Sequence, residues 1–183
     1  MDVAVALPPQ RSTMTDSPFL PNRDELVQNN ARFAERVNDE ELSVRPQRRL
    51  AIVACMDSRM DIFEMLGLEH GDAHIIRNAG GVVTDDVIRS LVLSQRRLGT
   101  REIILIHHTN CGLEGVSVDE FKQEIELECG IRPWWALEAF LDPYADVRQS
   151  IKRLELSPFI THKDHISGFV YDVVGGTLRP VER

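Results

Sequence analysis

Two thiols, an imidazole, a carboxylate and a guanidinium stand at short spacings in the middle of this 183-residue sequence. Cys55, Asp57 and Arg59 alternate along one stretch, and His108 and Cys111 lie three residues apart in another. Thiolate and imidazole ligands suit Zn²⁺, and three protein ligands leave one tetrahedral position open for water or substrate. A structural zinc site would normally have a fourth Cys or His. If the fold brings the two stretches together, these residues therefore predict a catalytic zinc site.

Both stretches directly follow a short apolar run. The runs Leu50–Cys55 and Glu102–His107 have the apolar, β-prone composition of strands that are buried on both faces of a parallel sheet. In an open α/β sheet, ligands bind beyond the carboxyl ends of the strands. We therefore expect Cys55, His108 and Cys111 to converge on one rim of the sheet.

A helix between the two runs makes them neighbours in a parallel sheet. Thr84 is a suitable N-cap for this helix and Gly99 a suitable C-cap, and the apolar residues between them recur with helical spacing. Strand, helix and strand at this spacing form a βαβ unit. The paired Gly80 and Gly81, which follow a short strand over Ala73–Arg77, let the backbone approach a neighbouring group closely.

The remaining segments complete an α/β fold with a mostly parallel central sheet flanked by helices. Further helices are expected over 23–38, 61–66, 117–128 and 142–157, and a last strand over 168–174 before a turn and a short edge segment. Residues 1–21 contain four prolines and predict a flexible N-terminal arm. Residues 22–183 are expected to form a single domain.

Composition excludes several classes of protein. The net charge of −8 argues against a nucleic-acid partner, because such a protein neutralises phosphates with basic side chains. No apolar run approaches the ~20 residues that a membrane span needs, and residues 1–10 make a poor signal peptide. Three widely spaced cysteines do not suggest a disulfide framework. We therefore expect a cytoplasmic protein with reduced thiols and no membrane partner.

Taken together, the motifs Cys55-x-Asp57-x-Arg59, Arg77-Asn-Ala-Gly80 and His108-x-x-Cys111, in this order, resemble the β-class carbonic anhydrases. The likeness runs from about residue 50 to about residue 113. The resemblance implies an α/β enzyme, active as a homodimer or homotetramer, with one zinc ion per subunit. By motif match, Cys55, His108 and Cys111 would bind the zinc, and Asp57 with Arg59 would form the catalytic dyad beside it.

The chemistry expected of such a site is the reversible hydration of CO₂ to bicarbonate. Zinc lowers the pKa of a bound water to about 7, which would produce a zinc-bound hydroxide near neutral pH. Asp57 would accept a hydrogen bond from this hydroxide and orient it, and Arg59 would hold Asp57 through a charge-assisted contact. If Arg59 releases Asp57, the carboxylate is a possible fourth zinc ligand in a closed, inactive state.

The sequence departs from the commoner family pattern beside the predicted ligands. His107 replaces the usual Gly, and Thr109-Asn110 replaces the usual Ser-Gly. A smaller branch of the family shares such features and includes enzymes that resemble carbonyl sulfide hydrolase. The alternative reaction is therefore hydrolysis of carbonyl sulfide, or of a related C=S triatomic, with the same zinc-bound hydroxide.

Readings without catalysis remain open at this stage. Two buried apolar thiols and a structural Asp57–Arg59 ion pair would involve no metal, and a zinc-stabilised binding protein closed by Asp57 would have no turnover. A cysteine-nucleophile phosphatase fits poorly, because its loop places Arg six positions after Cys. His107 is expected to point away from His108, as a core or interface residue. Cys129 is expected to be a plain thiol, and Trp134-Trp135 to serve packing or a subunit interface.

Overall fold

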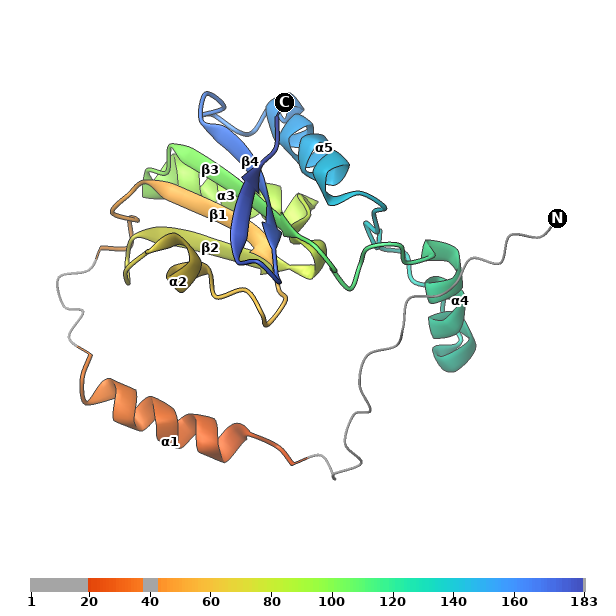
Figure 1. Ribbon diagram of the computed structural model, residues 1–183, viewed down its shortest axis with the longest axis horizontal. Coiled ribbons are helices and arrows are strands. Elements are labelled where there is room, and N and C mark those ends of the chain that lie inside the picture. The colour runs from red at the N-terminus through yellow and green to blue at the C-terminus, as the bar shows by residue number, and fades with distance from the viewer. Residues whose placement is uncertain (1–19, 38–42, 183) are drawn as a thin grey trace. The chain divides into compact units, whose positions relative to one another are not determined.

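The computed structural model describes residues 20–37 and 43–182 (Figure 1). The chain divides into two units, residues 1–41 and residues 42–183, which are described separately. Most of the expected N-terminal arm, residues 1–19, lies outside the described residues, and the expected domain boundary at residue 22 stays a prediction. In the first unit, α1 (Arg23–Ala34) ends earlier than expected, because the carbonyl of Phe33 accepts the N–H groups of Arg36 and Val37 in a closing turn.

The second unit contains a five-stranded sheet in the order β2-β1-β3-β4-β5. Four strands are parallel and the fifth is antiparallel, which confirms the predicted mostly parallel sheet. The strands are β1 (Leu50–Cys55), β2 (Ala73–Asn78), β3 (Glu102–His108), β4 (Ile166–Asp172) and β5 (Thr177–Pro180). All six residues of β1 are buried, as its continuous apolar run predicted.

The helices of this unit begin and end at the capping residues that the sequence offers. They are α2 (Ile62–Leu66), α3 (Asp85–Leu98), α4 (Val118–Cys129) and α5 (Pro143–Leu156), with a 3₁₀ turn over Ala79–Gly81. Each of these α-helices has an N-cap residue whose side chain accepts a backbone N–H of the first turn. These N-caps are Asp61, Thr84, Ser117 and Asp142. Gly67, Gly99 and Gly130 end α2, α3 and α4 in the left-handed conformation that glycine adopts without strain.

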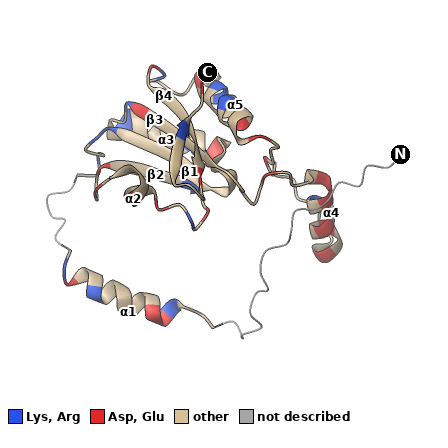
Figure 2. Ribbon diagram, in the orientation of Figure 1, with Lys and Arg blue, Asp and Glu red and all other residues tan. Residues whose placement is uncertain are grey.

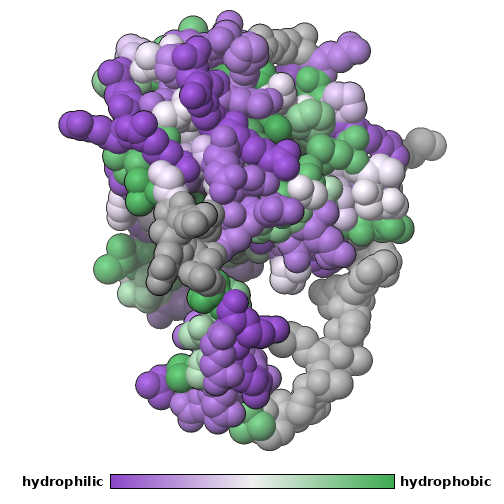
Figure 3. Space-filling view, turned by 90° about the vertical axis from the view of Figure 1, so that its left-hand side faces the viewer, coloured by the Kyte–Doolittle hydropathy of each residue, from purple (hydrophilic) through white to green (hydrophobic). Residues whose placement is uncertain are grey.

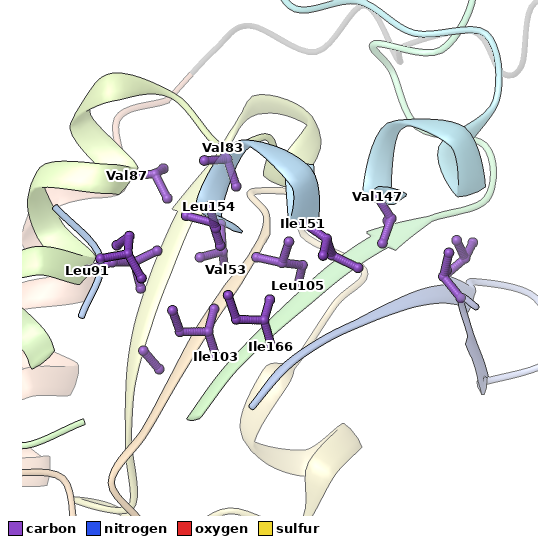
Figure 4. Close-up of a cluster of buried hydrophobic side chains, with 14 residues drawn as sticks. Val53, Val83, Val87, Leu91, Ile103, Leu105, Val147, Ile151, Leu154 and Ile166 are labelled. Carbon is purple, nitrogen blue, oxygen red and sulfur yellow. The ribbon is translucent and has the colours of Figure 1, made fainter. Parts of the chain in front are cut away.

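Two hydrophobic clusters hold helices against opposite faces of the sheet. On one face, α3 and α5 pack on β1, β3 and β4 through Val87, Leu91, Ile151 and Leu154, as Figure 4 shows. On the other face, alternate residues of the same strands, such as Ile52 and Ile106, pack with Met60 and Ile62 around α2. Burial on both faces fixes the register of β1 and β3, and with it the positions of their carboxyl ends.

β4 lies two residues earlier than the predicted strand over 168–174. The Asp172 side chain accepts the N–H groups of Val174 and Gly175, which starts the turn toward β5 before the apolar run is complete. Gly168 allows α5 to pack closely on this strand, because a Cβ there would lie 2.2 Å from Cγ1 of Val147.

α4 and the segment that follows it expose several large hydrophobic side chains to solvent. None of the residues of α4 is buried, and Figure 2 shows that most of its charged residues are acidic. Trp134 is 91% exposed, whereas Trp135 is 40% exposed and has the Lys122 ammonium 5.8 Å from its ring centroid, so the predicted role in packing or a subunit interface stays a prediction. Among the described residues, no helix combines the length and the apolar character that crossing a bilayer requires.

Candidate metal centre

The three predicted ligands meet where β1 and β3 end. The two strands are paired in parallel with Ala54 opposite Ile106, so Cys55 and His108 leave the sheet at the same rim. The Sγ atoms of Cys55 and Cys111 and a ring nitrogen of His108 all lie within 4.8 Å of one another, and all three residues are buried. Within the described parts of the chain, this is the one group of three Cys, His or carboxylate side chains with metal-site spacing.

The distances within this Cys55–His108–Cys111 cluster fit a tetrahedral zinc ion. Two sulfurs bound at about 2.3 Å with a tetrahedral angle between them would lie about 3.8 Å apart. The Sγ atoms of Cys55 and Cys111 are 3.9 Å apart. The two thiols can therefore bind one metal ion without a rearrangement of β1 or of the turn after β3 that carries Cys111.

The orientation of His108 also fits a metal ligand. Its Nδ1 atom is 3.0 Å from the carbonyl oxygen of Thr109, to which it donates, and its Nε2 atom is buried without a hydrogen-bond partner. A hydrogen bond from one ring nitrogen fixes the tautomer and directs the lone pair of the other nitrogen, as is usual for metal-bound histidines. This unpaired Nε2 atom faces the thiols.

The surroundings of the thiols favour one negative sulfur. The pKa of Cys55 lies well below its usual value, chiefly because Cys111 donates a hydrogen bond to it, and also because the His108 imidazole lies close by and the N–H groups of Asp57 and Gly80 point to it. The pKa of Cys111 is raised, because this thiol is the donor in that bond and is buried. The site therefore already stabilises thiolate, which is the form that binds metals.

Asn110 turns the chain between His108 and Cys111. Its φ of 55° lies in the left-handed region, where Asn is tolerated better than most residues other than Gly. This explains how the chain can carry Asn at a position where the commoner pattern has Gly. The turn also directs the Asn110 carbonyl oxygen to Nη2 of Arg59, at 3.0 Å.

Asp57 and Arg59 form a two-pronged ion pair beside the cluster. Nε of Arg59 is 2.8 Å from Oδ1 of Asp57, and Nη2 is 2.6 Å from Oδ2. These hydrogen bonds from Arg59 hold the pKa of the Asp57 carboxyl well below its usual range, so it is an ionised acceptor. Oδ2 of Asp57 lies 3.7 Å from Nε2 of His108, which places the carboxylate next to the predicted metal position.

Arg77 supports the site in a way that the sequence did not reveal, whereas Gly81 approaches a neighbouring strand closely, as the paired glycines predicted. Nε of Arg77 donates to the carbonyl of Cys55 at 2.9 Å, and Nη2 donates to the carbonyl of Asp57 at 2.6 Å. A Cβ on Gly81 would lie 2.7 Å from the backbone nitrogen of Cys55. The motif Arg77-Asn-Ala-Gly80 marked this stretch, but an arginine that binds backbone carbonyls has no partner residue type by which sequence could identify it.

The other candidate residues lie outside the cluster. His107 is fully buried and hydrogen-bonded to Asp146, which confirms the expected core position. Cys129 is exposed, and its thiol donates to the carbonyl of Ile131. The four other histidines, His70, His74, His162 and His165, do not join the cluster.

Comparison with known proteins gives matches that agree with this geometry. A family model described as carbonic anhydrase matches residues 50–153. "Beta-carbonic anhydrase 1" of Mycobacterium tuberculosis is 52% identical over 158 residues, which cover 86% of this chain and 96% of that protein. A carbon disulfide hydrolase of Acidithiobacillus thiooxidans is 32% identical over 161 residues, which cover 76% of this chain and 80% of that protein.

Solved structures of carbonic anhydrases and of a carbon disulfide hydrolase also resemble this chain. A carbonic anhydrase of Streptococcus mutans superimposes with a TM-score of 0.84 and 40% identity, covering 90% of this chain and all of that one. A carbon disulfide hydrolase in its apo form gives a TM-score of 0.71 and 29% identity, covering 87% of this chain and 92% of that one. With a family model that matches more than half of its residues and relatives that align over most of its length, the chain belongs to the β-carbonic anhydrase family.

Proposed function

We propose that this protein is a zinc enzyme that interconverts CO₂ and bicarbonate. The observation that carries the proposal is the buried Cys55–His108–Cys111 cluster with an ionised carboxylate beside it. The 52% identity to a protein named β-carbonic anhydrase supports this choice of substrate.

Cys55, His108 and Cys111 would hold the zinc ion. Zinc bound there would supply a Lewis acid that acidifies water near neutral pH. Two thiolates cancel the formal charge of the ion, so this acidification is weaker than at a three-histidine site. The neighbouring protein groups therefore have to contribute to the reaction.

Asp57 would orient the attacking water. Its carboxylate is ionised and accepts hydrogen bonds only, so it can accept a hydrogen bond from the water and direct an oxygen lone pair toward the carbon of CO₂. Arg59 is a positioning residue in this scheme, because it holds both oxygens of Asp57 and is itself fixed by the carbonyl of Asn110.

The same pair would also permit a closed state. If Arg59 releases Asp57, the carboxylate is close enough to become the fourth metal ligand and exclude water. X-ray absorption spectroscopy of the zinc-loaded protein would detect carboxylate coordination in that state.

Hydrolysis of a C=S triatomic is the second candidate. It is supported by the relatives named carbon disulfide hydrolase, one of which is 32% identical over 76% of this chain. Carbonyl sulfide and carbon disulfide are linear like CO₂, so the same ligands and the same dyad would serve, and the chemistry of the metal site does not separate the candidates.

Parallel assays of the zinc-loaded protein would test both candidates. We expect one zinc per chain, rapid CO₂ hydration in a stopped-flow pH-indicator assay, and slower release of H₂S from carbonyl sulfide and carbon disulfide. Cys55→Ser should lose zinc and all activity, whereas Cys129→Ser, at an exposed thiol outside the cluster, should keep both. Wild-type protein that is folded and active without metal would contradict the proposal, and faster H₂S release than CO₂ hydration would select the second candidate.

We further propose that the protein is a homo-oligomer. α1 has no buried residue, although Leu26, Val27 and Phe33 lie on it, and a 12-residue helix is marginal in water without packing partners. On the face shown in Figure 3, hydrophilic residues predominate and hydrophobic residues gather in a few patches. Sedimentation equilibrium should give a dimer or tetramer, and a monomer at micromolar concentration would contradict this. The cytoplasmic location stays a prediction.

A further inference from the structure

His107 and Asp146 form a buried imidazole–carboxylate pair directly behind the candidate metal centre. Nε2 of His107 is 2.6 Å from Oδ2 of Asp146, and the His107 side chain is fully buried. We propose that His107 is a positioning residue that fixes the end of β3, and thereby His108 and Cys111, in the geometry that retains zinc. This inference rests on the proposed function.

The position of His107 in the chain gives it this leverage without making it a ligand. Adjacent residues of a strand point to opposite faces, so His107 faces α5 while His108 faces the thiols. His107 and His108 pair with Val170 and Tyr171 of β4 at the last positions of the parallel ladder. Beyond these positions the ladder has ended, although Thr109 still bonds to the end of β4 and to the chain that follows it, and the His107 side chain adds a further anchor there.

Asp146 is well placed to provide the anchor. It lies in the first turn of α5, where the helix dipole stabilises a carboxylate, and Asp142 caps the same turn. The side chain of Asp146 is only 14% exposed. Because a hydrogen bond between a buried donor and a charged acceptor is costly to break, the pair holds α5 and β3 together at this point.

A second contact connects His107 with the far side of the ligand loop. Its ring lies 5.5 Å from the ring of Phe140, at an interplanar angle of 43°. The carbonyl of Phe140 accepts the N–H of Gly115, and the carbonyl of Cys111 accepts the N–H of Glu114. His107 therefore precedes the ligand loop in the chain, and through Phe140 it is also connected to Gly115, which follows the loop.

Partners that orient metal ligands typically contribute 10–100-fold to metal affinity. His107 acts through the backbone and through Phe140 rather than by touching a ligand side chain. We therefore expect an effect at the lower end, about tenfold in zinc retention.

The test is a double-mutant cycle on the full chain. His107→Ala, Asp146→Ala and the double variant are loaded with zinc, and zinc transfer to a chromogenic chelator is timed. We expect each single variant to lose zinc about tenfold faster than wild type, and the double variant to be no faster than the singles, because they remove the same contact. Asp146→Asn should restore much of the retention, because its carbonyl oxygen can still accept the Nε2–H.

Ser150→Ala is the matched control. Ser150 is buried on the same helix and accepts the N–H of Val83 at 3.4 Å, so it makes no hydrogen bond to the ligand loop. It should lower the thermal midpoint without changing zinc transfer. The visible spectrum of the Co²⁺-loaded protein should change in the His107 and Asp146 variants and not in the control.

The outcomes separate this inference from the proposed function. Zinc transfer from the His107 and Asp146 variants at the rate of Ser150→Ala, or additive effects in the double variant, would overturn the positioning role. If His107→Ala does not fold, Asp146→Ala against Asp146→Asn provides the same comparison. Wild-type protein that binds zinc without hydrating CO₂ would refute the proposed reaction and leave this inference standing.

Discussion

Alanine at Gly81 is predicted to disturb the candidate metal centre through the backbone alone. Gly81 has a φ of 71°, and a Cβ there would lie 2.7 Å from the nitrogen of Cys55, 2.9 Å from the carbonyl carbon of Ala54 and 3.0 Å from the carbonyl oxygen of Ile106. All three are backbone atoms of the central strands, which cannot rotate away. A shift of the chain between β1 and β3 is therefore required.

Two other glycines allow the contributions to be separated. Gly99 also has a positive φ, of 81°, but nothing lies within 4 Å of its Cβ position. Gly99→Ala should therefore cost only the left-handed strain, about 1 kcal/mol in the free energy of unfolding. Gly81→Ala adds overpacking to that strain, for a total of about 2–4 kcal/mol. Gly80→Ala should lie between them, because its closest contact, at 2.9 Å, is the flexible Leu113 side chain.

Urea unfolding of the three variants, with a chelator present and at one protein concentration, measures these differences without a contribution from zinc binding. Zinc titration of the folded proteins then shows whether the collision reaches Cys55. Gly81→Ala should bind zinc more weakly, and Gly99→Ala should bind it as wild type does. Equal destabilisation by Gly81→Ala and Gly99→Ala would refute the close approach of this turn to β1.

Three further predictions concern single side chains. Asn110→Gly should leave the free energy of unfolding unchanged or slightly raised. Asn110→Val should lower it by about 1–2 kcal/mol in urea unfolding, because a branched side chain resists the left-handed turn. Equal stability of the two variants would contradict this. Arg77→Ala removes the donors to the carbonyls of Cys55 and Asp57 and should lower the rate of CO₂ hydration in a stopped-flow assay about tenfold. The control Arg148→Ala, on α5, should leave this rate unchanged. Equal rates in the two variants would exclude a role for Arg77. The N–H of Glu69 and the guanidinium of Arg48 hold the pKa of Asp72 below its usual value. The ionised Asp72 therefore stabilises the fold at pH values above its unfolded-state pKa of about 3.9. This contribution is lost as the pH falls through the folded-state pKa. Asp72→Asn should therefore reduce the difference in unfolding free energy between pH 6 and pH 3, and an unchanged difference would count against this linkage.

Local sequence patterns were sufficient for the framework of the fold. The apolar runs predicted the buried parallel strands β1 and β3. The predicted caps were also correct, because α3 begins after Thr84 and ends before Gly99. Since the carboxyl ends of parallel strands share a rim, the convergence of Cys55 and His108 followed from topology before any distance was known. β4 was misplaced by two residues because hydrophobicity alone does not show that the Asp172 side chain starts the turn.

Contacts between distant segments were beyond the reach of sequence reasoning. Asp146 lies 39 residues from His107, and nothing in its local pattern distinguishes it from an ordinary first-turn acid of a helix. The hydrogen bonds of Arg77 end on backbone carbonyls, which every residue has. Such contacts depend on how α5 and β2 are placed against β1 and β3, and a single sequence carries no local signal for that placement.

The residues in which this chain departs from the commoner family pattern have structural explanations that leave the ligands in place. Asn110 adopts the left-handed turn that Gly would adopt, and its carbonyl reaches Arg59. The backbone N–H of Thr109 donates to Tyr171, and its hydroxyl accepts the N–H of Val173, which extends the pairing of β3 with β4. His107 is anchored by Asp146. Because each departure changes the support of the ligand loop rather than its ligands, selectivity between CO₂ and C=S substrates has to be sought in the residues that shape access to the metal.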